Sequence, residues 1–200
     1  MNVAEIKYCD IANGPGVRTS LFVSGCTHRC RGCFNEVAWD FAYGEPFNDE
    51  TAEQILASMK PPYIRGLTLL GGEPMEPVNQ RALLPFLKRF REELPGKDLW
   101  CYTDYTLETD LLPLRKENGQ QAMSDGAAAS GGESPAAGRA RCEVTDELLS
   151  LIDVLVDGEY VEEQKSVSLR FRGSGNQRVI DLPATLAKGQ IVLSRYGEKE

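Results

Sequence analysis

Strand-like and helix-like segments alternate along the chain, and this alternation limits the possible folds more than any other feature. Residues 18–24 are apolar and β-branched, 49–59 have the helical spacing of apolar side chains, and 66–70 again favour a strand. Further helices are predicted at 81–93, 106–114 and 145–151, and further strands at 98–103 and 152–156. The alternation favours an α/β fold, in which helices pack against a parallel sheet.

A chain of 200 residues can bury one hydrophobic core but not comfortably two, so we expect a single domain over 1–182. Residues 116–141 are rich in Ala, Gly, Ser and Gln, which leaves too little apolar surface to offset the entropy of ordering them. We expect 116–141 to be a disordered insertion within this domain. Residues 183–200 end in Lys and Glu and are expected to form a loosely held tail.

The charge of the chain restricts the kinds of partner. The formal net charge is -8, and no block of Lys and Arg is present. Nucleic acid is not expected as a partner, because proteins bind it mainly with Lys and Arg that neutralise phosphates. The apolar stretches are too short to span a bilayer, and the first residues resemble no targeting sequence. We therefore expect a cytoplasmic protein that has no membrane contact and binds proteins or small molecules.

Three of the six cysteines, Cys26, Cys30 and Cys33, lie within eight residues directly after the predicted strand 18–24. Cysteine thiolates hold iron-sulfur clusters, and three of them would leave the fourth iron of a 4Fe-4S cluster open to a substrate. The alternative is a structural zinc site with His28 as the fourth ligand. Structural zinc sites usually take two pairs of ligands from separate turns, so the spacing favours the cluster. His28 is then expected at the surface of the cysteine loop.

A second motif, Gly71-Gly72-Glu73-Pro74, follows the predicted strand 66–70. Paired glycines allow a close backbone approach and unusual dihedral angles, although such a pair after a strand is often only a turn. Glu73 would offer a carboxylate to an ammonium group through a charge-assisted hydrogen bond, or it would be a solvated turn residue. The motif is more specific beside the cysteines than alone.

The cysteine loop and the Gly-Gly-Glu motif together resemble the radical S-adenosylmethionine superfamily. Segments 10–18, 24–40, 153–158 and 172–180 further resemble the activating proteins of anaerobic ribonucleoside-triphosphate reductase. The resemblance implies a partial (β/α) barrel of the radical S-adenosylmethionine type, with its site at the carboxyl ends of the strands. It also implies a 4Fe-4S cluster held by Cys26, Cys30 and Cys33, and an S-adenosylmethionine pocket lined by Gly32, Cys33, Phe34, Gly72 and Glu73. Phe34 is expected to shield the adenine or the cluster from water.

The family's activity implies two protein partners. Reduced flavodoxin or ferredoxin would give one electron to the cluster, S-adenosylmethionine would be cleaved, and the resulting 5'-deoxyadenosyl radical would take a hydrogen from a glycine of the reductase. The alternatives are the activation of another glycyl-radical enzyme such as pyruvate formate-lyase, action on a small molecule, or a zinc-binding module without catalysis. The segments 153–158 and 172–180 favour the reductase.

A few other residues are open to two interpretations. Asp157 would reach the ribose or the partner's loop, or would only end a strand, and Arg18 would steady an anion near the pocket or only begin one. Trp39 and Trp100 are expected to be packing residues. Asp104 stands where the family more often has glycine, near a strand end, where it would alter the rim of the pocket.

Overall fold

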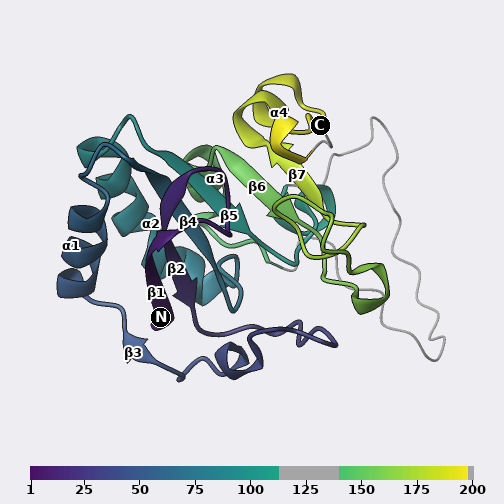
Figure 1. Cartoon of the computed structure of the whole chain (residues 1–200), viewed down its shortest axis with the longest axis horizontal. Coiled ribbons are helices and arrows are strands. Elements are labelled where there is room, and N and C mark those ends of the chain that lie inside the picture. Colours follow the sequence, from purple (N-terminus) through teal and green to yellow (C-terminus); the bar gives the residue numbers. More distant parts are fainter. Residues whose placement is uncertain (113–139, 198–200) are drawn as a thin grey trace, which may run out of the picture.

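An open sheet of seven strands forms the centre of the computed structural model, which describes residues 1–112 and 140–197. The strand order is β3-β1-β2-β4-β5-β6-β7. The strands are β1 (Asn2–Asp10), β2 (Val17–Val23), β3 (Glu45–Pro46), β4 (Ile64–Gly71), β5 (Asp98–Tyr102), β6 (Val154–Asp157) and β7 (Arg178–Asp181). Figure 1 shows the edge strands β3 and β7 at opposite ends of the sheet, which is not closed into a barrel.

The sheet is mixed. Strands β2, β4, β5 and β6 run parallel, whereas β1, β3 and β7 each pair antiparallel with a neighbour. The predicted α/β class is confirmed, and the four parallel strands are the predicted ones. The antiparallel strands were not predicted; β1, for example, has mostly exposed or half-buried side chains and gains its conformation from pairing with β2.

Four α-helices accompany the described strands: α1 (Asp49–Ser58), α2 (Pro77–Glu93), α3 (Thr145–Ser150) and α4 (Leu182–Lys188). Helix α1 begins after Asn48, whose side chain accepts a hydrogen bond from the backbone N–H of Thr51 at 2.9 Å and so caps the helix. Helix α2 begins at Pro77, a favoured first helical residue because proline has no N–H to leave unsatisfied. None of the described helices is long and apolar enough to cross a membrane.

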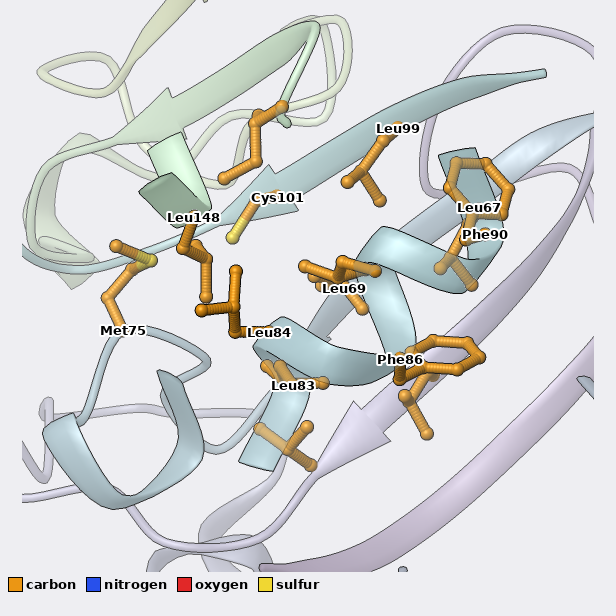
Figure 2. Close-up of a cluster of buried hydrophobic side chains, with 14 of the residues drawn as sticks. Leu67, Leu69, Met75, Leu83, Leu84, Phe86, Phe90, Leu99, Cys101 and Leu148 are labelled. Atoms are coloured by element: carbon orange, nitrogen blue, oxygen red, sulfur yellow. The ribbon is translucent and has the colours of Figure 1, made fainter. Parts of the chain in front are cut away.

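The main core lies between the sheet and helices α1, α2 and α3. Figure 2 shows side chains of α2, among them Leu83 and Phe90, facing Leu67 and Leu69 of β4 and Leu99 of β5. The apolar residues of α2 recur at helical spacing, so that one face of the helix is buried. Burial of each such side chain contributes about 1.5–3 kcal/mol to the free energy of folding.

A smaller aromatic cluster is built around Trp100 of β5. Its ring is fully buried and lies 5.5 Å from that of Phe171 and 5.4 Å from that of Tyr196, measured between ring centroids. The partners come from the segment 159–177 and from a short helical turn, Arg195–Gly197, rather than from a long helix. The expectation that Trp100 is a packing residue is confirmed.

The described residues after β7, up to Gly197, are packed, which differs from the expectation of a loosely held tail over 183–200. Asp181 caps α4 by accepting from the backbone N–H of Ala184 at 3.0 Å, and the N–H of Ser194 returns to the carbonyl of Val179 at 2.8 Å. Most of the predicted insertion, 116–141, lies outside the described residues. Of its described part, Ala140 is fully buried and its carbonyl accepts from Gln80 Nε2 at 2.7 Å.

Candidate functional site

A pocket of about 420 Å³ lies at the carboxyl ends of the parallel strands, a volume within the usual range for small-molecule sites. It is lined by the loop after β2, the residues that follow β4 and β5, and parts of the segment 159–177, which we call the second wall. Sites of parallel α/β folds lie at this end of the strands. All the site residues predicted from sequence line this pocket, namely Cys26, Cys30, Gly32, Cys33, Phe34, Gly72 and Glu73.

The cysteine loop is closed at its base by backbone hydrogen bonds. The N–H of Gly25 donates to the carbonyl of Ala38 at 2.8 Å, and that of Cys26 donates to the carbonyl of Trp39 at 3.2 Å. Gly25 has a φ of +95°, and an added Cβ would collide with the ring of Phe41, so glycine is required there. The base of the loop therefore has a defined position above the strand ends.

Three thiols of this loop differ in exposure. Cys26 and Cys30 are buried, whereas Cys33 is half-buried. Burial, together with the negative charge of Glu73, raises the pKa of the Cys26 thiol to about 12. Burial and a hydrogen bond to Asp104 also raise the pKa of the Cys30 thiol. Thiolates of this kind form when a metal replaces the proton, and metal binding releases that proton.

The described His, Cys, Asp and Glu side chains are not gathered around one point as a zinc site requires. Within residues 1–112 and 140–197, no group of three or more His, Cys, Asp and Glu side chains is placed to hold a single metal ion. A 4Fe-4S cluster makes a different demand, because the three thiolates would each bind a different iron. Three thiols that line one pocket without converging are compatible with the cluster, so the donor set fits it.

Gly72 brings the two sequence motifs into contact. Its N–H donates to the carbonyl of Val23 at 2.7 Å, and the N–H of Glu73 donates to that of Gly25 at 2.8 Å. A Cβ at position 72 would lie 2.6 Å from the carbonyl oxygen of Gly25 and 2.8 Å from that of Ala38. Glycine is thus required because the cysteine loop crosses directly over the end of β4.

Glu73 is a buried residue and not the solvated turn residue that the sequence left open. Its Oε1 accepts from the N–H of Met75 and its Oε2 from the N–H of Asp104, both at 2.8 Å. Burial, and next the charge of Asp104, raises its pKa to about 8. The carboxylate links the ends of β4 and β5 while lining the pocket.

His28 is not the surface residue that the sequence predicted. Its side chain is only 12% exposed, and its Nε2 lies 4.0 Å from Glu73 Oε2. The ring packs edge-on against Tyr105 with 4.3 Å between centroids. The cause is the crossing of the cysteine loop over the strand ends, which places His28 between the loop and the residues that follow β5.

Asp104 contributes more to the site than the sequence indicated. Its Oδ2 accepts from Cys30 Sγ at 2.9 Å and its Oδ1 from the N–H of Tyr160 at 3.3 Å. It therefore connects the cysteine loop, the end of β5 and the second wall. The sequence feature that could have indicated this role is the position of Asp104 directly after a predicted parallel strand, where pocket residues are expected.

The second wall packs on the tip of the cysteine loop. A Cβ at Gly32 would collide with the carboxylate of Glu162, and Arg31 pairs with Glu163 at 3.3 Å. Sequence reasoning did not assign this wall to the site, since no local pattern marks it. Phe34 lines the pocket but is 81% exposed, so in this structure its ring does not shield the interior.

Arg18 and Asp157 lie outside the pocket lining. Asp157 is fully buried, accepts from the N–H of Leu107 at 2.9 Å and pairs with Arg178, so it does not face a ligand as one interpretation of the sequence required. The guanidinium of Arg18 lies near the amino ends of the strands, where it pairs with Asp98 at 2.6 Å. Both residues contribute to the packing of the sheet. Trp39, expected only to pack, does line the pocket.

Comparison with known proteins agrees with this geometry. The chain matches the family model described as a 4Fe-4S single cluster domain over residues 12–180, which include all the pocket residues. Three similar proteins carry the name anaerobic ribonucleoside-triphosphate reductase-activating protein. The protein of Pasteurella multocida is 40% identical and covers 88% of this chain and 95% of its own length. The protein of Escherichia coli K12 is 36% identical and covers 90% of this chain and 97% of its own length. The protein of Enterobacteria phage T4 is 32% identical and covers 90% of this chain and 93% of its own length. The chain belongs to this family of activating proteins.

Proposed function

We propose that this protein activates an anaerobic ribonucleoside-triphosphate reductase by generating a glycyl radical through reductive cleavage of S-adenosylmethionine. The observation that supports this most is the meeting of the cysteine loop and the Gly71–Glu73 motif in one pocket. The relatives named as activating proteins share the length of the chain that builds this pocket. They also favour the reductase over pyruvate formate-lyase or a small molecule as the target.

Cys26, Cys30 and Cys33 would hold the 4Fe-4S cluster. When bound, the cluster would supply one electron for the reductive cleavage of S-adenosylmethionine, the chemistry that would lead to removal of a hydrogen from a glycine of the reductase. Gly32, Cys33, Phe34 and Gly72 would line the S-adenosylmethionine site, and Glu73 would accept from its ammonium group. Reduced flavodoxin or ferredoxin in the cytoplasm would supply the electron.

The residues of this chain would position the reactants. The buried Cys26 and Cys30 set the depth of the site, and the backbone at Gly72 leaves room for a close approach. Positioning a reactant beside the reacting centre lowers the entropic part of the barrier. The sheet is not closed, and in the partial barrel that we propose, the open side would admit the glycine loop of the reductase.

The test is anaerobic reconstitution with iron and sulfide, followed by reduction with dithionite in the presence of S-adenosylmethionine. We expect about four irons per chain, as one 4Fe-4S cluster contains, release of 5'-deoxyadenosine, and a glycyl radical signal once the reductase is added. Cys30→Ala should lose the cluster and all three signals. Cys9→Ala is the matched control, because Cys9 is an exposed thiol outside the pocket lining.

Two outcomes would contradict the proposal. Binding of one zinc ion without cleavage of S-adenosylmethionine would assign the cysteines to a structural metal. Cleavage of S-adenosylmethionine without a radical on the reductase, combined with a radical on pyruvate formate-lyase, would change the protein substrate.

A further inference from the structure

Arg172 is a pocket residue whose guanidinium is only partly satisfied by the chain. Its Nη1 donates to the carbonyl of Gln177 at 2.8 Å, but its Nε is buried and has no hydrogen-bond partner. Within the described ranges, no carboxylate forms an ion pair with it. A buried donor without an acceptor destabilises the fold, so this donor indicates an acceptor that the chain does not supply.

The position of Arg172 is fixed by the turn that follows it. Oε1 of Gln177 accepts from the N–H groups of Gly173 at 2.8 Å and Ser174 at 3.1 Å. Nε2 of the same side chain donates to the carbonyl of Gly158, directly after β6, at 2.9 Å. The turn is thus tied to the end of β6, and the guanidinium is tied to the turn through its Nη1, so that it is organised before any ligand binds.

The charges that line the pocket come from separate parts of the chain. The carboxylates of Glu73 and Asp104 follow β4 and β5, whereas the cations Lys165 and Arg172 come from the second wall. Lys165 is 58% exposed and pairs with Glu162 at 3.7 Å, which leaves Arg172 as the lining cation without a carboxylate among the described residues. This distribution matches a ligand with an ammonium group and a carboxylate, as in an α-amino acid.

We propose that Arg172 binds the carboxylate of the methionine moiety of S-adenosylmethionine. The inference rests on the proposed function, which places this molecule in the pocket. Arginine suits the task because its planar group donates two parallel hydrogen bonds to a carboxylate. An acidic side chain of the reductase has the same chemistry, and the experiment below separates the two sources.

The test compares the affinities of S-adenosylmethionine and its decarboxylated analogue for reconstituted protein by anaerobic calorimetry. Arg172→Gln should bind S-adenosylmethionine about 10- to 100-fold more weakly than the wild type, the range that a hydrogen bond to a charged group supplies. The same substitution should leave the affinity for the analogue nearly unchanged, because the analogue lacks the carboxylate. Arg172→Lys should recover part of the lost affinity, since it keeps the charge without the planar group.

Arg170→Gln is the matched control. It removes the same charge, two residues away from Arg172, and the Arg170 side chain does not line the pocket. We expect wild-type affinity for both ligands. Iron content and the midpoint of thermal unfolding are measured for every variant. If Arg172→Gln does not fold, Arg172→Lys carries the comparison of the two ligands.

Three results are distinguishable. Equal weakening of both ligands by Arg172→Gln would make Arg172 a structural residue and overturn the inference. Unchanged binding of S-adenosylmethionine with weaker binding of the reductase would assign the guanidinium to the reductase and also overturn it. Failure of the wild type, loaded with its cluster, to bind S-adenosylmethionine would instead overturn the proposed function.

Discussion

The two ends of the parallel strands differ in how their buried charges are compensated. Near the amino ends, the fully buried Arg18 donates to the hydroxyl of Thr68 at 2.7 Å and pairs with Asp98 at 2.6 Å. At the carboxyl ends, Glu73 is equally buried but has no Lys or Arg partner among the described residues, and Arg172 keeps an unpaired Nε. The charges at the first end are paired within the chain, whereas Glu73 and Arg172 at the second end have no charged partner of this kind among the described residues.

This difference separates stability from binding. A buried charge that is fully paired holds the strands together, and removing its partner leaves an uncompensated charge. Buried charges and thiols without such partners instead mark the end where a ligand binds. Substitutions at the amino ends should therefore reduce the free energy of unfolding, and those at the carboxyl ends should reduce cluster binding as well.

The largest effect on stability is expected at Arg18. Arg18→Met should lower the free energy of unfolding by about 3–5 kcal/mol, the cost of breaking a buried ion pair, while the folded fraction keeps its iron. Denaturant unfolding and iron analysis measure the two effects. Arg65→Gln removes the more exposed partner of Asp98 and should cost at most about 1 kcal/mol. Loss of iron from Arg18→Met without loss of stability would contradict the division between the two ends.

A smaller loss of stability, accompanied by loss of the cluster, is expected at Gly72. Gly72→Ala forces the cysteine loop away from β4 and should cost about 1–3 kcal/mol as an overpacked site. Iron content after reconstitution should fall with it. Gly96→Ala is the control, because an added Cβ there meets nothing within 4 Å. A fully loaded Gly72→Ala protein would show that the close approach is not needed.

The smallest effect on stability is expected at the ion pair of Arg178 and Glu108, which differs from that of Arg18 in being half-exposed. Arg178 binds Glu108 through both oxygens, at 2.8 and 2.6 Å, and this hydrogen bonding lowers the pKa of Glu108. A lowered pKa gives stability that is complete above the unfolded value, about 4.3, and is lost as the pH falls through the folded value.

Glu108→Gln should therefore cost at most about 1 kcal/mol at pH 7 and nothing in more acidic buffer, once the wild-type carboxylate is protonated. Urea unfolding of both proteins across this pH range measures the difference. A difference that stays constant on acidification would assign the effect to packing rather than to charge.

The sequence predicted the elements whose burial pattern is strong. The periodicity of α2 and the apolar run of β4 are strong local signals, and both elements were predicted in the correct order. The predicted strand was three residues shorter than β4, and the predicted helix started four residues later than α2. Strand β7 and helix α4 were not predicted, since β7 has four residues and is held by pairing with β6, a contact that no local pattern reveals. Tertiary contacts of this kind determine whether a short edge strand forms.

The site was predicted where its residues are close in sequence. Cys26, Cys30 and Cys33 form one spacing motif, and their common pocket with Gly72 follows from the rule that parallel strands end together. Arg172 lies far along the chain, and its role depends on an unpaired atom that only coordinates reveal. The roles proposed for these residues remain predictions for the experiments above.

The second wall has a consequence for the biosynthesis of the protein. The cysteine loop leaves the ribosome before Tyr160, Arg172 and Gln177, which line the same pocket but lie more than 120 residues further along the chain. Because chains fold from the amino terminus as they emerge, the thiols of a nascent chain have no cover from this wall. A pocket that includes the second wall can therefore form only after this later segment has left the ribosome.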